Sequence, residues 1–150
     1  MLRYVHTNIV AKDAGKLIAF YKSALCLKSI GETRDLRGAW LDGLTGLKAA
    51  HITGEHLLLP GHGEDGPTLE IFQYNEQAGE LPRAVNRPGF AHIAFQADDV
   101  QATLKAVQDA GGGSVGETIV TQYSDGRELT VVYARDPEGN IIELQSWRQP

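Results

Sequence analysis

The chain repeats one order of elements twice, and this repeat limits the possible folds more than any other feature of the sequence. Each half is predicted to run strand, helix and then three strands. The first strands are residues 4–10 and 89–96, and the last strands are residues 68–74 and 140–147. Each first strand carries one histidine near its middle, and each last strand carries one glutamate. The repeat predicts two similar modules, residues 1–75 and 89–150.

A helix follows the first strand of each module. Asp13 is suited to cap the first helix, in which apolar residues recur at helical spacing up to residue 25. In the second module Asp98 is expected to cap the helix, with Gln101 three residues later as a reciprocal partner. Three glycines at 111–113 are expected to end that helix.

The other segments complete the two modules. Strands are predicted at residues 28–34, 48–59 (bent near Gly54), 114–123 and 128–134, and a turn or short helix at 36–46. Residues 76–88 contain two prolines and a glycine and show no periodicity, which indicates a linker. We expect one α+β domain over residues 1–150, in which two βαβββ modules form a curved, mixed sheet of eight strands.

Four polar residues interrupt the apolar strands at matched positions: His6, Glu70, His92 and Glu143. A charge inside an apolar strand is costly to bury unless a cationic group receives it. Residues two apart share a face of a strand, so each of the four lies opposite an apolar face suited to packing under a helix. We therefore expect these residues to converge on one metal ion.

Apolar residues share the predicted polar wall. Phe72, Tyr74, Ile141 and Trp147 are expected to line a pocket around the charges, although Phe72 and Trp147 also suit a core position. The remaining histidines are His51, His56 and His62. None has a counterpart in the other module, so we expect polar strand or loop residues rather than ligands.

Composition excludes several classes of function. The net charge of −5 offers no basic surface for nucleic acid, and no apolar run is long enough to span a bilayer. Cys26 is the single cysteine, which rules out an intrachain disulfide and indicates a packing residue rather than a nucleophile. The first residues show no signal-peptide pattern. We expect a cytoplasmic protein that binds a small molecule.

Two motifs point to a known family. One is Phe90-Ala91-His92-Ile93-Ala94-Phe95 followed by Asp98-Asp99-Val100, and the other runs from Arg135 to Leu144. The chain resembles the vicinal oxygen chelate superfamily over its whole length. That group includes glyoxalase I, methylmalonyl-CoA epimerase, extradiol dioxygenases and fosfomycin resistance proteins. The resemblance implies a glyoxalase-like fold.

The resemblance also implies a metal site and a reaction. The family's ligands fall on His6, Glu70, His92 and Glu143, which would hold one divalent ion (Zn, Ni, Co, Mn, Mg or Fe). Such an ion binds adjacent oxygens of a substrate and stabilises an enediolate or enolate. Similarity to glyoxalase I gives Glu143 the role of base and Glu70 that of returning the proton. The fourth ligand, Glu70, favours this lyase or isomerase chemistry, because the dioxygenases and thiol transferases resemble the pattern with three.

Other members of the superfamily remain alternatives: an iron dioxygenase, a thiol transferase, or a metal-free protein of the bleomycin-binding kind. A two-base epimerase is disfavoured, because residues 48–53 contain no acid and Glu55 lies past the expected place. Arg34, Arg37, Arg83 and Arg87 are candidates, by charge alone, to meet the carboxylates of glutathione. A homodimer is expected, with the site formed either within one chain or across two.

Overall fold

A computed structural model describes all 150 residues, and they divide into two compact units. Residues 1–22 and 26–80 form the first unit, and residues 23–25 and 81–150 form the second. The boundary at residue 80 falls inside the predicted linker, and no helix or strand lies between Tyr74 and His92. That the two units make one domain stays a prediction.

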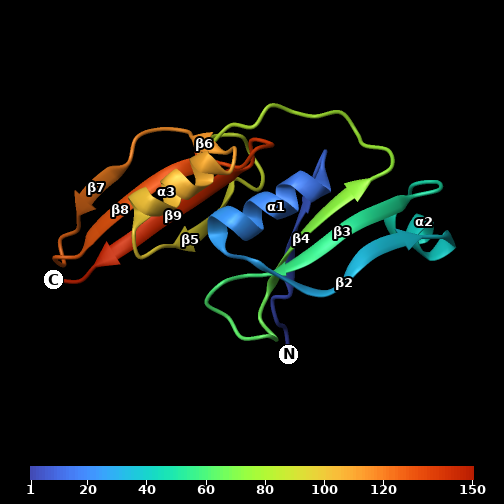
Figure 1. The fold of residues 1–150 in the computed structure, drawn as a ribbon, viewed down its shortest axis with the longest axis horizontal. Helices are drawn as coiled ribbons and strands as arrows, with labels where there is room; N and C mark the ends of the chain where they lie inside the picture. The colour runs from blue at the N-terminus through green and yellow to red at the C-terminus, as the bar shows by residue number, and fades with distance from the viewer. The chain divides into compact units, whose positions relative to one another are not determined.

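The first unit contains a four-stranded sheet (Figure 1). Its elements are β1 (His6–Val10), α1 (Ala14–Leu25), β2 (Lys28–Arg37), α2 (Ala39–Thr45), β3 (His51–Leu58) and β4 (Thr68–Tyr74). The strand order is β1-β4-β3-β2, with β1 parallel to β4 and the other pairs antiparallel. The first and last strands of the module therefore lie side by side, which brings the His6 strand to the Glu70 strand.

The second unit repeats this arrangement with one more strand. Its elements are β5 (His92–Gln96), α3 (Val100–Asp109), β6 (Gly113–Ser114), β7 (Ile119–Gln122), β8 (Glu128–Arg135) and β9 (Ile141–Arg148). β5 is parallel to β9, β9 pairs with β8, and both β6 and β7 pair with β8. The α+β class and the paired βαβββ modules are confirmed.

The number and grouping of strands differ from the prediction. Nine strands form two sheets, whereas eight strands in one sheet were expected. The predicted strand at 114–123 is interrupted after Ser114, and pairing with β8 resumes at Ile119. Gly116 lies in the interruption, and glycine weakens a strand because it loses more conformational freedom on folding.

Aspartates cap both long helices. The Asp13 carboxylate accepts a hydrogen bond from the Lys16 amide at 3.0 Å, as predicted for α1. At α3 the cap is Asp99, which accepts from the Ala102 amide at 3.0 Å, so the predicted Asp98 cap was wrong by one residue. The reason is geometric, since a capping side chain must reach an amide of the first turn. None of the three helices has the length and apolar character needed to cross a membrane.

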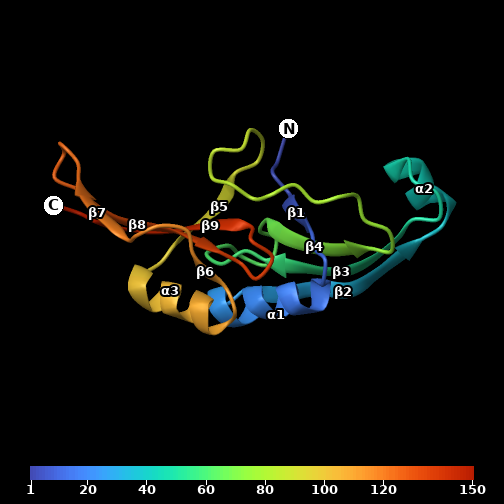
Figure 2. The same ribbon diagram turned by 90° about the horizontal axis from the view of Figure 1, so that it is seen from above.

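The strands carry their apolar residues on one face, as the alternation predicted. Leu57, Leu69 and Ile71 are completely buried in the first unit, and Ile142 and Leu144 are completely buried in the second. Figure 2 shows α3 along one face of β8 and β9, which it contacts. The opposite faces carry Glu70 and Glu143.

Gly54 allows β3 to approach β4 closely. A Cβ atom at this position would lie 2.0 Å from the carbonyl oxygen of Ile71, and the φ angle of +151° is one that side chains rarely adopt. The backbone contact lies two residues along β3 from His56. The close spacing of β3 and β4 near the site thus depends on glycine, which has no side chain, at position 54.

We expect Gly54→Ala to lower the free energy of unfolding by about 2 kcal/mol or more, because the added methyl group meets backbone that cannot move aside. Urea denaturation measures this change. Gly43→Ala in α2 is the matched control, since nothing lies within 4 Å of its Cβ position. The control should leave stability unchanged or raise it by up to about 1 kcal/mol. Equal effects of the two substitutions would contradict the role of Gly54.

Candidate metal centre

Glu70 is a nearly buried carboxylate with three polar side chains beside it. Its side chain is 10% exposed. The strand register places Asn8 of β1 and His56 of β3 directly beside it. His6 Nε2 lies 3.3 Å from Oε2, Asn8 Nδ2 donates to the same oxygen at 3.3 Å, and His56 Nε2 lies 2.9 Å from Oε1. His6 and Glu70, two of the four predicted ligands, therefore lie beside each other, with two further residues around the carboxylate.

His56 is held at both ring nitrogens. Nδ1 lies 3.3 Å from the Thr68 hydroxyl, and the ring packs edge-on against Phe72 at 5.7 Å. Burial lowers the pKa of His56; the Glu70 carboxylate opposes this shift, while Arg34 and His6 reinforce it. The carboxylate 2.9 Å from Nε2 has no proton to give, so we place the ring proton on Nε2 and leave Nδ1 to accept from Thr68. We assign this tautomer from the hydrogen-bond partners.

The second unit holds the other two predicted ligands, His92 and Glu143, with the same spacing. His92 Nε2 lies 3.3 Å from Glu143 Oε2, and the Glu143 side chain is 18% exposed. The register places Ala94 and Tyr133 beside Glu143, where the first unit has Asn8 and His56. The Tyr133 ring packs against His92, with 5.1 Å between ring centroids.

Both pairs fit the donor spacing of a bound metal ion. Two donors that bind one ion at about 2.1 Å each and at right angles lie about 3.0 Å apart. Each nitrogen-to-oxygen distance is 3.3 Å. The imidazoles keep an accessible edge, with His6 43% and His92 32% exposed. Imidazole and carboxylate donors suit Zn, Ni, Co, Mn or Fe.

Each unit supplies two such donors by itself. No group of three or more His, Cys, Asp or Glu side chains is placed to hold a metal ion. In the first unit His6 and His56 approach different oxygens of Glu70, and their ring centroids lie 6.1 Å apart. The sequence analysis gave His56 no part in the site, because the residue has no counterpart in the repeat. Only the register of β3 against β4 reveals its position.

The predicted pocket residues have different surroundings. Phe72 touches His56, and both Phe72 and Tyr74 pack against the buried cluster of Leu41, Ala50 and Ile52. Trp147 lies on β9, where the Arg127 guanidinium sits 4.9 Å from the centre of its ring. Phe72 thus contacts His56, which lies beside the predicted ligand Glu70. That these residues line a pocket around the charges stays a prediction.

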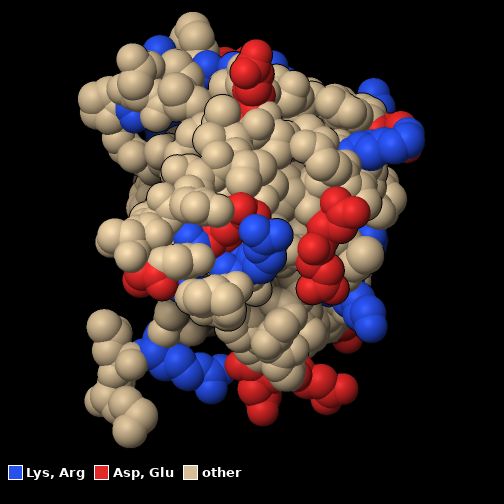
Figure 3. Space-filling model, turned by 90° about the vertical axis from the view of Figure 1, so that its left-hand side faces the viewer, with Lys and Arg blue, Asp and Glu red and all other residues tan.

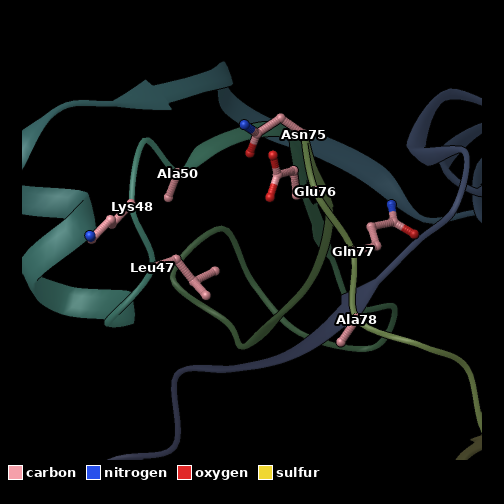
Figure 4. A pocket seen from close by; sticks show the side chains of 7 residues that line it. All are labelled: Leu47, Lys48, Ala50, Asn75, Glu76, Gln77 and Ala78. Atoms are coloured by element: carbon pink, nitrogen blue, oxygen red, sulfur yellow. The ribbon is translucent and has the colours of Figure 1, made fainter.

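A pocket of about 370 Å³ lies in the first unit, where the chain leaves β4 (Figure 4). The residues lining it are Leu47, Lys48, Ala50, Asn75, Glu76, Gln77 and Ala78. None of them is a predicted site residue. The Asn75 amide donates to Ala49 O and the Gln77 amide to Ala11 O, so these side chains tie loops together. This pocket is separate from the His6–Glu70 pair.

Several charged candidates are engaged by the protein itself. Arg37 bonds to both oxygens of Asp35 at 2.9 and 3.0 Å, and His51 lies 2.6 Å from the same carboxylate. Arg87 donates to the carbonyl of Pro82 at 2.8 Å. Figure 3 shows basic and acidic side chains interspersed over the face that it draws. The proposed contacts of the arginines with substrate stay untested.

The sequence that forms these two modules matches the model of a known protein family. Residues 3–144 match the model of the Glyoxalase/Bleomycin resistance protein/Dioxygenase superfamily. The chain belongs to this superfamily. The match covers both units and all four predicted ligands.

Two relatives carry the same name. The chain is 26% identical over 145 residues to a protein of Vibrio parahaemolyticus named "Probable lactoylglutathione lyase", covering 95% of this chain and 88% of the relative. It is 24% identical over 147 residues to a protein of the same name from Vibrio cholerae, with the same coverage. The superfamily is established, and the particular reaction is not fixed at this identity.

Solved structures show the same fold. A glyoxalase family protein from Bacillus cereus is similar with a TM-score of 0.74 and 21% identity, over 97% of this chain and 93% of that one. Glyoxalase I from Zea mays is similar with a TM-score of 0.63 and 20% identity, over 99% of this chain and 45% of that one. These likenesses confirm the glyoxalase-like fold.

Glu55 lies next to His56 in β3 but on the opposite face of the strand. Lys22 Nζ of α1 donates to its carboxylate at 2.8 Å, and the Ser29 hydroxyl donates to the same oxygen. These hydrogen bonds, that of Lys22 first, lower the pKa of Glu55 below its ordinary value of 4.5. Glu55 therefore joins the helix to the sheet and does not face Glu70.

We expect Glu55→Gln to lower the free energy of unfolding at pH 7 by about 0.5–1 kcal/mol, because the pair is partly exposed. The lowered pKa means that the stabilising contribution is present above pH 4.5 and is lost as the pH falls through the folded-state value. Denaturation of both proteins from pH 7 downward should show the difference shrinking in acid. Glu64→Gln, in an exposed loop, is the control. A difference that grew in acid would contradict the assignment.

Proposed function

We propose that this protein is a metal-dependent lyase or isomerase of the glyoxalase I type. His6, Glu70, His92 and Glu143 together would bind one divalent ion. The observation that carries the proposal is the 3.3 Å separation of an imidazole nitrogen and a carboxylate oxygen, found in both units. Two matching half-sites are what one ion with two histidine and two glutamate ligands requires. Membership of the superfamily supports the same reading.

The substrate class follows from the relatives' name. Lactoylglutathione is a thioester, and its isomer is the adduct of glutathione with a 2-oxoaldehyde, which carries adjacent oxygens. Conversion of the adduct to the thioester moves one proton from the carbon bonded to sulfur to the neighbouring carbon, and a second proton from the hydroxyl of the first carbon to the carbonyl oxygen of the neighbouring carbon. Because no atom or electron is gained or lost, the enzyme needs only a base and a means of polarising the carbonyl.

The roles of the protein's own groups follow from their contacts. When bound, the ion would polarise the substrate carbonyl as a Lewis acid. Glu143 is the base that takes the proton and returns it to the neighbouring carbon, because only its Oε2 has a protein partner, His92. Return of the proton by Glu70, expected from the sequence, would require that residue to leave its contacts. We also propose a homodimer in the cytoplasm.

Metal content provides the first test. Protein purified without chelators or a metal-binding tag should contain about one divalent ion per chain, because the four donors match one ion. Glu70→Gln and His92→Ala should lower this content several-fold in elemental analysis. His62→Ala, in the exposed loop before β4, is the control and should retain the metal. Wild-type protein that binds no divalent ion after incubation would overturn the proposal, and iron in place of the other metals would favour a dioxygenase.

Activity provides the second test. With methylglyoxal and glutathione the protein should form the thioester, which absorbs in the ultraviolet. Glu143→Gln should lower kcat by about 10²- to 10⁴-fold, the usual contribution of a positioned base. Chelation should abolish the activity and added metal should restore it. Full activity of Glu143→Gln would contradict the role of this residue as base.

A further inference from the structure

We infer that Asn8 and His56 are positioning residues that fix Glu70 as a permanent ligand and leave proton transfer to Glu143. The inference rests on the function proposed above. It assigns different tasks to two carboxylates that occupy equivalent places in the repeat. The reason lies in the residues beside each carboxylate on the neighbouring strands.

Donors reach both oxygens of Glu70. His56 Nε2 is 2.9 Å from Oε1, and Asn8 Nδ2 is 3.3 Å from Oε2. The carboxylate would have to leave at least one of these contacts to turn toward a substrate. The side chain is also only 10% exposed, so water could not replace the lost donors without opening the site.

His56 is itself fixed from two sides. The Thr68 hydroxyl lies 3.3 Å from Nδ1, and Phe72 packs edge-on against the ring. Thr68 and Phe72 flank Glu70 on β4, two residues to either side, and share its face. One strand therefore carries the carboxylate together with the hydroxyl and the aromatic ring that orient its partner.

The same contacts argue against His56 as a third ligand. A neutral imidazole has one nitrogen with a free lone pair. In His56 the Thr68 hydroxyl lies beside Nδ1 and the Glu70 carboxylate lies beside Nε2, so neither nitrogen is open to an ion. Histidines and amides that act in this way, behind the ligands, commonly change metal affinity by about 10- to 100-fold.

The equivalent places around Glu143 hold no such donors. Ala94 stands in the position of Asn8 and has no polar side chain. Tyr133 stands in the position of His56, and its ring packs against His92 instead. Glu143 accordingly keeps Oε1 without a protein partner and can move. The difference between the two modules thus separates a fixed ligand from a mobile base.

The affinity for Ni²⁺ or Zn²⁺, measured by competition with a chromophoric chelator, tests the inference. His56→Ala and Asn8→Ala should raise the Kd by about 10-fold or more, because Glu70 loses a donor. His56→Gln should recover most of the affinity, since its amide nitrogen can reach Glu70. His51→Ala is the matched control on the same strand, because His51 pairs with Asp35 rather than Glu70, and its Kd should not change.

The outcomes separate this inference from the proposed function. If the wild-type protein binds no metal, both the proposed function and this inference are overturned. If His56→Ala is folded, as judged by circular dichroism, and binds metal as tightly as the wild type, only the role of His56 is overturned. Nitrogen-15 NMR of metal-free wild-type protein gives a check that needs no variant. It should find the His56 proton on Nε2, and a proton on Nδ1 with a bare Nε2 would overturn the inference.

Discussion

A carboxylate in the middle of an apolar strand is the constraint on which the rest of the site depends. Glu70 and Glu143 each lie between residues that are completely buried on the opposite face of the sheet. Burial of such a charge is costly unless donors surround it. Parallel pairing of the first strand of each module with the last supplies a histidine in both units. The strand pairing of the fold therefore also supplies the polar groups that make burial of each carboxylate possible.

The two modules solve this problem unequally. In the first, three side chains surround Glu70, and the Thr68 hydroxyl and the Phe72 ring hold one of them. In the second, a single histidine contacts Glu143, and alanine and tyrosine fill the neighbouring places. The proton transfer that we propose needs ligands that stay in place and a base that moves. Two copies of one module can provide a fixed ligand and a mobile base if they differ at the two places that flank the carboxylate.

The site also depends on packing some distance away. Phe72 joins a buried cluster with Leu41 of α2 and with Ile52 of β3, and it touches His56 from the same position. Gly54 lets β3 approach β4 closely enough for this contact to form. The pocket at the end of β4 takes no part in this arrangement, since its lining residues are others. A close fit of backbone and aromatic ring therefore orients the polar groups.

The sequence by itself determined the repeat, the Asp13 cap and the matched strand positions of His6, Glu70, His92 and Glu143. These features follow from local periodicity, because alternate residues share a strand face wherever the strand lies. The tertiary structure alone decided the interruption between β6 and β7, the cap at Asp99, and the places of Asn8 and His56 beside Glu70. Those two residues lie 62 and 14 positions from Glu70 in the chain. The register between strands brings them together, and that register is set along whole strands and by the turns between them rather than by the residues next to Glu70.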